Sequence, residues 1–178
     1  MATRLGNTAF RQGRKVLNLS AYVTFYFTVL ANKLSSGASR LYLKRYGIGI
    51  IEWRVMAMLA VEPRISPARI CQIIGLDKGA VSREMRKLEA KGYLLVEEDS
   101  ESSRRRTLEL TDKGYEIHDE IIRTALERER RLLQGLSAEE VETLLGLLVR
   151  TTANIPHVNE YVPPSNSPTT RGRSKKRS

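Results

Sequence analysis

Apolar residues recur at helical spacing over four stretches of the chain. The longest covers 17–46, where the apolar positions form a stripe about six turns long on one face of a helix. Shorter stretches with the same period lie at 51–60, 112–134 and 137–148. The pattern predicts long helices on both sides of a smaller central segment.

The central segment begins with two short helices. Ser66 is a suitable N-cap, and Pro67 fits the first helical position, where its missing N–H costs no hydrogen bond. Gly75 ends this helix, Asp77 caps the next, and Gly92 stops it. The apolar positions of the two helices are Ile70, Ile73, Ile74, Val81, Met85 and Leu88. Two helices joined by a turn with glycine are typical of the helix-turn-helix.

Two predicted strands follow, at 93–98 and 107–111. In the second, Leu108 and Leu110 alternate with polar residues, which is the two-residue period of a half-buried strand. The loop between the strands carries Arg104, Arg105 and Arg106. A helix-turn-helix followed by a hairpin predicts a winged helix-turn-helix. The expected fold class is therefore mainly α with a small β-hairpin wing (α+β).

The second short helix has a cationic and hydroxylic side away from its apolar stripe. A recognition helix presents such side chains to DNA, where arginine can donate two hydrogen bonds to guanine. An arginine at a hairpin tip can enter a narrow minor groove. The candidate DNA-binding residues are Ser66, Lys78, Ser82, Arg83, Arg86, Lys87, Arg104 and Arg105. The alternative interpretation is a charged, solvated surface, which such runs of charge often form.

Three strings resemble the MarR (multiple antibiotic resistance regulator) family of transcription factors. They are YGIGIIEWRVMAMLAVEP, SPARICQIIGLDKGAVSREMRKLEAKGYL and RRRTLELTDKG, and the resemblance runs from about residue 17 to 158. It implies a homodimer that binds a palindromic operator in double-stranded DNA, with a repressor as the expected kind of regulator. It also implies that a small aromatic effector binds between the dimerisation helices and the DNA-binding lobe. The resemblance assigns the DNA contacts to Lys78, Ser82, Arg83, Arg86 and Arg104.

The wing departs from the family pattern at one position. Relatives usually carry a second aspartate two residues before the tip arginine. Here Asp99 is kept, but the second position is Ser102. A serine cannot supply the carboxylate that would orient Arg104, which leaves Glu101 as the alternative partner.

The formal net charge of +10 is concentrated near the two ends of the 178-residue chain. Residues 1–15 carry +4 and residues 171–178 carry +5, so the region between them is nearly neutral. Basic arms of this kind suit sequence-independent attraction to polyphosphate. The expected parts are a basic arm (1–16), one domain (17–158) with dimerisation helices (17–64 and 112–158) around the winged helix-turn-helix (65–111), and a disordered basic tail (159–178).

Aromatic residues are the candidates for an effector site. Tyr22, Tyr26 and Trp53 could line a cleft between the first long helix and the DNA-binding lobe, together with Tyr42 and Tyr46. Aromatic residues at helical spacing are more often part of a core or an interface. The effector site therefore depends mainly on the resemblance.

Several functional classes are disfavoured. The apolar run at 22–31 is too short and too polar to span a bilayer, and the single cysteine fits a reducing, cytoplasmic location. We interpret Cys71 as a packed, inert thiol. His118 and His157 lack partners that would indicate a triad or metal site, and His118 is expected to be solvated or to cap a helix. We expect no enzyme activity, no cofactor and no metal.

One non-enzymatic alternative remains open. The basic arms would also suit an architectural, nucleoid-type protein that binds DNA with little sequence preference. A regulator should prefer one palindrome over random DNA by roughly a thousandfold or more. The specificity ratio therefore distinguishes the two functions.

Overall fold

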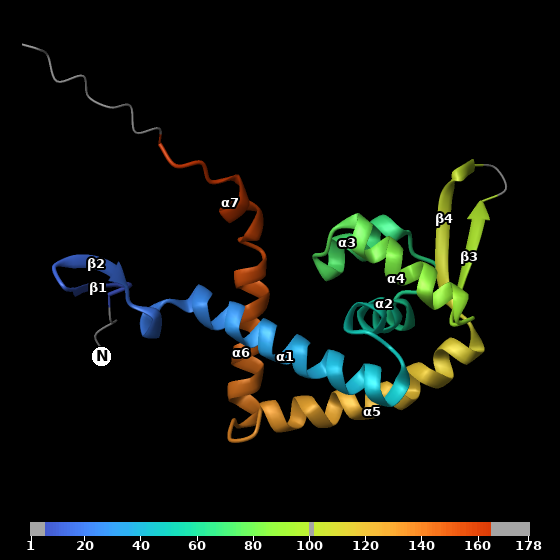
Figure 1. Cartoon of the computed structure of the whole chain (residues 1–178), viewed down its shortest axis with the longest axis horizontal. Helices are drawn as coiled ribbons and strands as arrows, with labels where there is room; N and C mark the ends of the chain where they lie inside the picture. Colours follow the sequence, from blue (N-terminus) through green and yellow to red (C-terminus); the bar gives the residue numbers. More distant parts are fainter. Residues whose placement is uncertain (1–5, 100–101, 165–178) are drawn as a thin grey trace, which may run out of the picture. The chain divides into compact units, whose positions relative to one another are not determined.

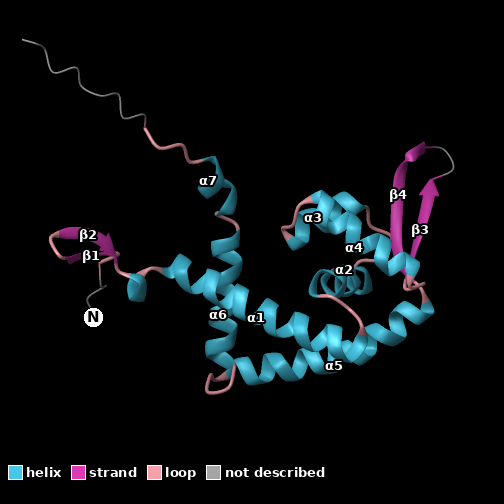
Figure 2. Cartoon of the chain, viewed as in Figure 1, coloured by secondary structure: helices cyan, strands magenta, loops and turns pink. Residues whose placement is uncertain are grey.

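The computed structural model describes residues 6–99 and 102–164, and it is mainly helical. The chain divides into two compact units, residues 1–128 and 129–178, and α5 crosses from the first to the second. The helices are α1 (Val23–Tyr46), α2 (Ile50–Val61), α3 (Pro67–Ile74), α4 (Lys78–Ala90), α5 (Asp112–Leu132), α6 (Ala138–Thr152) and α7 (Ile155–Glu160). The strands form two antiparallel hairpins, β1 (Thr8–Arg11) with β2 (Arg14–Leu17) and β3 (Leu94–Asp99) with β4 (Ser102–Leu110). Figures 1 and 2 show these elements along the chain.

The helix-turn-helix has the predicted boundaries and caps. The Ser66 hydroxyl accepts a hydrogen bond from the amide of Arg69 at 3.3 Å, and the Asp77 carboxylate accepts one from the amide of Ala80 at 2.9 Å. Gly75 ends α3 with a φ of 67°, a left-handed conformation that glycine adopts without steric cost. These local signals therefore set where α3 ends and α4 begins.

The wing is longer than the hydrophobic pattern indicated. β4 begins at Ser102, whereas alternation predicted a strand only from residue 107. Val96 faces Leu108 and Leu94 faces Leu110 at the end near the core, while Glu98 pairs in register with Arg106 farther out. The prediction was wrong at this end because the ladder is held by backbone groups, which need no apolar side chain. Alternation detects only the half-buried part of such a strand.

The core joins α2, α3, α4 and the wing into one lobe. Figure 2 shows the three helices gathered beside the β3–β4 hairpin. The fully buried members contributed by these elements are Val55, Met56, Leu59, Ile70, Val81, Leu88 and Leu108, each at no more than 1% exposure. Ile121 of α5 is also fully buried. Burying one such side chain contributes about 1.5–3 kcal/mol, so the core holds α4 against α2.

The first helix starts later than predicted, and a hairpin precedes it. Residues 8–17, which were expected to belong mostly to a basic arm, form β1 and β2 instead. A short 3-10 turn, η1 (Leu19–Ala21), leads into α1 at Val23. The hairpin turn is Gln12–Gly13, and both residues have positive φ values. The predicted helix began too early because Leu19 and Tyr22 continue the apolar spacing, although Leu19 lies in the 3-10 turn and Tyr22 is the N-cap of α1.

The second unit contains the end of α5 followed by α6 and α7. Ser137 and Glu140 form a capping box, with Ser137 Oγ accepting from the Glu140 amide at 3.2 Å and Glu140 Oε2 accepting from the Ser137 amide at 2.8 Å. Helix α7 reaches residue 160, two residues into the stretch predicted to be a disordered tail. Residues 165–178, which carry the basic end of that tail, lie outside the described residues.

Candidate nucleic-acid interface

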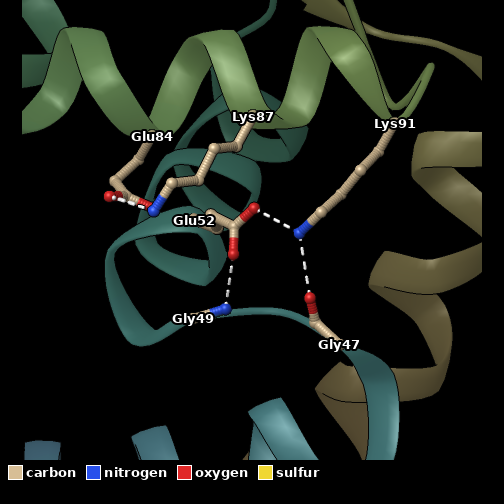
Figure 3. A network of polar contacts seen from close by, with 6 residues as sticks. All are labelled: Gly47, Gly49, Glu52, Glu84, Lys87 and Lys91. Carbon is tan, nitrogen blue, oxygen red and sulfur yellow. Dashed lines mark hydrogen bonds and ion pairs between the residues drawn. The ribbon is translucent and has the colours of Figure 1, made fainter.

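A polar network anchors the C-terminal end of α4 to α2 (Figure 3). Glu52 of α2 is only 3% exposed, and its carboxylate accepts from Lys91 Nζ at 2.5 Å and from the Gly49 amide at 2.6 Å. Lys91 Nζ also donates to the carbonyl of Gly47 at 2.9 Å. A buried carboxylate needs such partners, because leaving it unpaired is costly. The network therefore fixes the end of α4 against the start of α2.

A groove of about 780 Å³ runs along the exposed side of α4. Its walls come from the start of α3, from one side of α4 and from the inner part of the wing. The charged and hydroxyl side chains that line it are Arg64, Ser66, Lys78, Ser82, Arg86, Glu89, Arg106 and Thr107. Four cations and one carboxylate leave the groove positive, which favours a polyanion.

Arg64 enters this groove through an unusual backbone conformation. Its φ of 59° is left-handed, which is uncommon for a residue with a Cβ. The Arg64 amide donates to the carbonyl of Leu108 at 3.0 Å, and the bridge between Ile65 and Leu108 adds a third extended segment to the wing. The Arg64 guanidinium pairs with Glu109 at 3.0 Å, and this hydrogen bond is the main reason that the pKa of Arg64 is raised. Arg64 is thus positioned at the base of the wing.

The structure brings four of the predicted DNA-binding residues into the groove. They are Ser66, Lys78, Ser82 and Arg86. The Ser66 hydroxyl is already used as the N-cap of α3. Arg86 Nη2 donates to Ser82 Oγ at 3.4 Å, so these two side chains lie together one turn apart. The groove therefore unites a hydroxyl, a guanidinium and an ammonium on one side of α4.

The other predicted residues lie elsewhere. Arg83 is exposed on α4 but does not line the groove, and its guanidinium lies beside Gly79 in the first turn. Lys87 does not line the groove either. Its Nζ binds both oxygens of Glu84, at 2.8 and 3.0 Å, and this contact raises the pKa of Lys87. The side chains of Arg104 and Arg105 lie outside the described residues, as do those of Asp99 and Ser102.

Two cationic groove residues, Arg64 and Arg106, were not among the predicted contacts. Arg64 lies in the turn before α3, where neither helical nor strand periodicity indicates a functional side chain. Its location depends on the bridge to Leu108, a contact between distant parts of the chain. Arg106 belongs to the arginine run that was noted for the wing, but it lies nearer the core than Arg104 and Arg105. Its position in this run of arginines was the sequence signal that could have identified Arg106 as a groove residue.

The predicted effector residues do not form one cluster. Trp53 packs against Tyr42, with ring centroids 6.0 Å apart, and burial raises the pKa of the Tyr42 hydroxyl despite the opposing effect of Arg128. Tyr26 lies 16 residues before Tyr42 on α1, which places it about 24 Å away along the helix. Tyr22 is the N-cap residue of α1. The tyrosine that contacts Trp53 is therefore Tyr42, rather than Tyr22 or Tyr26.

The expectation that His118 is solvated or caps a helix was wrong. His118 lies inside α5, is only 9% exposed and stacks on Trp53 with centroids 5.4 Å apart and ring planes 25° apart. Its Nδ1 is 3.0 Å from Asp119 Oδ1. The ring is buried because α5 packs on α2. The acidic residues beside His118 in the sequence suggested an exposed position, and they give no sign of this packing. Cys71, by contrast, packs partly buried against the core, as expected.

Comparisons with known proteins fit this arrangement. The model of the MarR family matches residues 46–106, which cover the helix-turn-helix and most of the wing. The chain is 31% identical over 118 residues to the uncharacterised HTH-type transcriptional regulator YkoM of Bacillus subtilis (strain 168), covering 65% of this chain and 75% of YkoM. A MarR/EmrR family transcriptional regulator from Acinetobacter sp. ADP1 is similar in structure, with a TM-score of 0.74 and 35% identity, over 79% of this chain and 99% of that one. The chain belongs to the MarR family.

The regulator also shares its fold with a putative MarR family protein from Listeria monocytogenes that was solved with a 26mer DNA. The TM-score is 0.73 at 20% identity, over 81% of this chain and 98% of that one. The family and the fold are those of transcriptional regulators and not of enzymes. Among the described residues, no group of His, Cys, Asp and Glu side chains could hold a metal ion, and no helix is long and apolar enough to cross a membrane.

Proposed function

We propose that this MarR-family regulator binds a specific palindromic operator in double-stranded DNA as a homodimer and acts there as a repressor. The positive groove along α4 carries this proposal, because Lys78, Ser82 and Arg86 of α4 line it together with residues of α3 and the wing. The relative from Listeria monocytogenes that was solved with DNA has the same fold. The operator would lie across this side of the lobe.

Each side chain suits a different part of the DNA. Arg86 and Arg83 carry planar guanidinium groups, which can bind guanine with two hydrogen bonds in the major groove. Lys78 lies in the first turn of α4, where the free amides and the helix dipole favour a phosphate. Arg64 and Arg106 border the base of the wing, where a phosphate of the flanking backbone would meet them. Arg104, nearer the tip, would reach a minor groove.

The dimer is supported by an apolar surface on α6 that stays exposed among the described residues. On α6, Leu144, Leu145 and Leu148 are 38–56% exposed and share one helical stripe. Exposed apolar patches of this kind mark interaction sites, and a second copy of the chain would cover them. A two-fold dimer would present two α4 helices to successive major grooves about 34 Å apart.

An effector is a finer part of the same proposal. The aromatic group formed by Tyr42, Trp53 and His118 connects α1, α2 and α5, and Trp53 follows directly after the anchoring residue Glu52. A small aromatic compound inserted here would shift α2 and therefore α4. A thermal-melting screen with phenolic acids tests this. Ligands that raise the melting temperature should also weaken operator binding, and a screen without any shift would remove the effector from the proposal.

Selection of bound fragments from a random DNA pool tests the main function. We expect a palindrome with half-sites about one helical turn apart and an affinity at least about a thousandfold above that for random DNA. Enrichment of no motif, with similar affinity for all fragments, would instead identify an architectural DNA-binding protein. The net charge of +10 makes that second function the natural competitor.

A further inference from the structure

The N-terminal hairpin is a closed structural element. β1 and β2 pair antiparallel from Thr8 with Leu17 to Arg11 with Arg14. The two turn residues, Gln12 and Gly13, have φ values of 50° and 74°, the combination that gives two-residue hairpins the correct twist. At the base, the Asn18 amide donates to Asn7 at 2.9 Å and the Asn18 side chain donates to Gly6 at 3.2 Å. The hairpin therefore presents its tip in a defined geometry.

The tip of this hairpin carries unpaired positive charge. Arg11 lies directly opposite Arg14, and like charges at such positions destabilise a hairpin unless an anion lies near them. Arg11, Arg14 and Lys15 are exposed, and none of their side chains makes a hydrogen bond or ion pair with any other residue that the structure describes. The first acidic residue of the whole sequence is Glu52, whereas residues 1–51 contain eight lysines and arginines. Nothing nearby in the sequence neutralises the tip.

The two faces of the hairpin differ in character. Side chains of directly paired residues share a face, so Arg11 and Arg14 lie together, while Phe10 shares the other face with Lys15. Phe10 is 75% exposed. The face with Arg11 and Arg14 is thus the more strongly charged one. Its two neighbouring guanidinium groups suit phosphate, because each guanidinium can donate two hydrogen bonds to phosphate oxygens.

We propose that the β1–β2 hairpin is a second DNA-binding element, which holds the phosphate backbone of duplex DNA through Arg11 and Arg14. The contact carries no sequence information and adds to the one made by α4 and the wing. This inference rests on the DNA-binding function proposed above. The hairpin would strengthen binding to any duplex and make it more sensitive to salt.

Salt dependence of binding to a random-sequence duplex of 40 base pairs tests the hairpin. In R11Q/R14Q, two phosphate contacts are lost per hairpin, so the slope of log K against log salt concentration should become shallower by about 1.8 for each hairpin engaged. The matched control is R40Q/K44Q, which removes two exposed cations one turn apart on α1. We expect the control to keep the wild-type slope. Sedimentation of each variant establishes that its oligomeric state is unchanged.

Other outcomes would overturn the inference. A wild-type slope in R11Q/R14Q, or equal changes in both double variants, would show that the hairpin makes no contact of its own. A changed oligomeric state in R11Q/R14Q alone would identify the hairpin as a protein contact. Wild-type protein that binds no duplex at all would remove the proposed function together with this inference. If the wild type binds and only the predicted change in slope is missing, the inference alone fails.

A third variant separates the folded hairpin from its charge. Gly13→Val keeps every cation but places a β-branched residue at a φ of 74°, where it is strained. We expect its affinity for the 40-base-pair duplex to fall below that of the wild type at equal salt. Wild-type affinity and slope in Gly13→Val would show that an open basic chain suffices, which contradicts a role for the hairpin geometry.

Discussion

Gly114 shows how closely α5 approaches the wing at the scale of one residue. It is buried in the first turn of α5, and a Cβ atom added to it would lie 2.2 Å from the carbonyl oxygen of Tyr93. Its amide donates to the hydroxyl of Thr111 at 2.9 Å, and that hydroxyl donates to the carbonyl of Gly92 at 2.8 Å. The backbone of α5 therefore touches the backbone at the start of β3.

Gly114→Ala should destabilise the protein by about 1–3 kcal/mol, because the added methyl group forces two backbone segments apart. Urea unfolding measures the change in the free energy of unfolding. Gly146→Ala is the control, since Gly146 lies in α6 off the leucine stripe and a Cβ there meets nothing within 4 Å. The control should be neutral or stabilising by up to about 1 kcal/mol. Equal effects of both substitutions would contradict the close approach.

Arg83, with Lys87 one turn later as its control, tests whether the side of α4 outside the groove meets the bases. Arg83→Ala should cost about 1–3 kcal/mol of binding at the selected operator and much less on random DNA, if Arg83 reads a base. Lys87→Ala removes a neighbouring cation that Glu84 already neutralises. Its loss of binding free energy should therefore be smaller than that of Arg83→Ala on the operator, and small on random DNA. Fluorescence anisotropy with both duplexes gives the four affinities. Equal losses for Arg83→Ala on the operator and on random DNA would assign it to a phosphate.

Single residues with local roles were predictable, and residues with tertiary roles were not. The caps Ser66 and Asp77 accept hydrogen bonds from amides three residues away, so the adjacent sequence is enough to predict their role. His118 is buried only because α5 packs on Trp53 of α2, 65 positions earlier. Arg64 reaches the groove only because its loop bridges to β4. Contacts between residues so far apart in the sequence leave no pattern in the residues next to either partner, so periodicity and capping rules do not predict them.

At the scale of elements, the orientation of α4 depends on both of its ends. Asp77 caps the start, and Lys91 ties the end to Glu52 and Gly47 (Figure 3). Between them, Val81 and Leu88 are fully buried in the core. The exposed side of α4 is therefore held in one direction. A recognition helix must have a defined direction to place its side chains in a DNA groove.

Lys91→Ala should destabilise the lobe by about 1–3 kcal/mol, because it leaves the Glu52 carboxylate buried with only the Gly49 amide as a partner. The value lies below that for a fully buried pair, since Lys91 is 35% exposed and solvent weakens the interaction. Chemical unfolding measures it. Lys87→Ala, on the same helix, should change stability little because Lys87 is 58% exposed. If Lys91→Ala unfolds like Lys87→Ala, the network does not anchor α4.

The predicted bounds agree with the structure for two helices, while the long stripe at 17–46 starts six residues before α1 and two short strand segments were missed. Helices α2 and α5 lie within two residues of their predicted bounds, since apolar stripes extend along them. The β1–β2 hairpin was missed because its strands have four residues each and only Ala9 and Val16 are half-buried. The outer half of β4 was missed for a similar reason. Backbone pairing there needs no apolar pattern.

At the scale of the whole molecule, the proposed dimer depends on the apolar face of α6, formed by Leu144, Leu145 and Leu148. We expect sedimentation to show a stable dimer at micromolar concentration. Leu145→Asp places a charge on the exposed stripe and should shift the protein towards monomer, with loss of operator binding, because the two α4 helices would no longer be linked. Thr143→Asp adds the same charge off the stripe and should leave the dimer intact. A stable wild-type monomer, or a dimer unaffected by Leu145→Asp, would contradict this assembly.

We expect the basic segment at residues 171–178 to strengthen binding to all DNA alike, because its charge suits any phosphate backbone. Deleting residues 171–178 removes five cations and should weaken binding to operator and random duplexes by a similar factor. The same anisotropy measurements at several salt concentrations should show that the affinity of the truncated protein depends less steeply on salt, for the operator duplex and for the random duplex. A loss confined to the operator would mean that the tail recognises sequence, contrary to its composition.

The sequence by itself determined the order of the elements from α1 to α6, the caps of α3 and α4 and the winged helix-turn-helix. These features depend on residues close together in the sequence, and hydrophobic spacing and capping residues can be read from such short stretches. Only the tertiary structure decided which cations share the groove, that His118 is buried against Trp53 and that the N-terminal arginines lie opposite each other. Those features depend on packing between elements and on strand register, which bring together residues that local patterns treat separately.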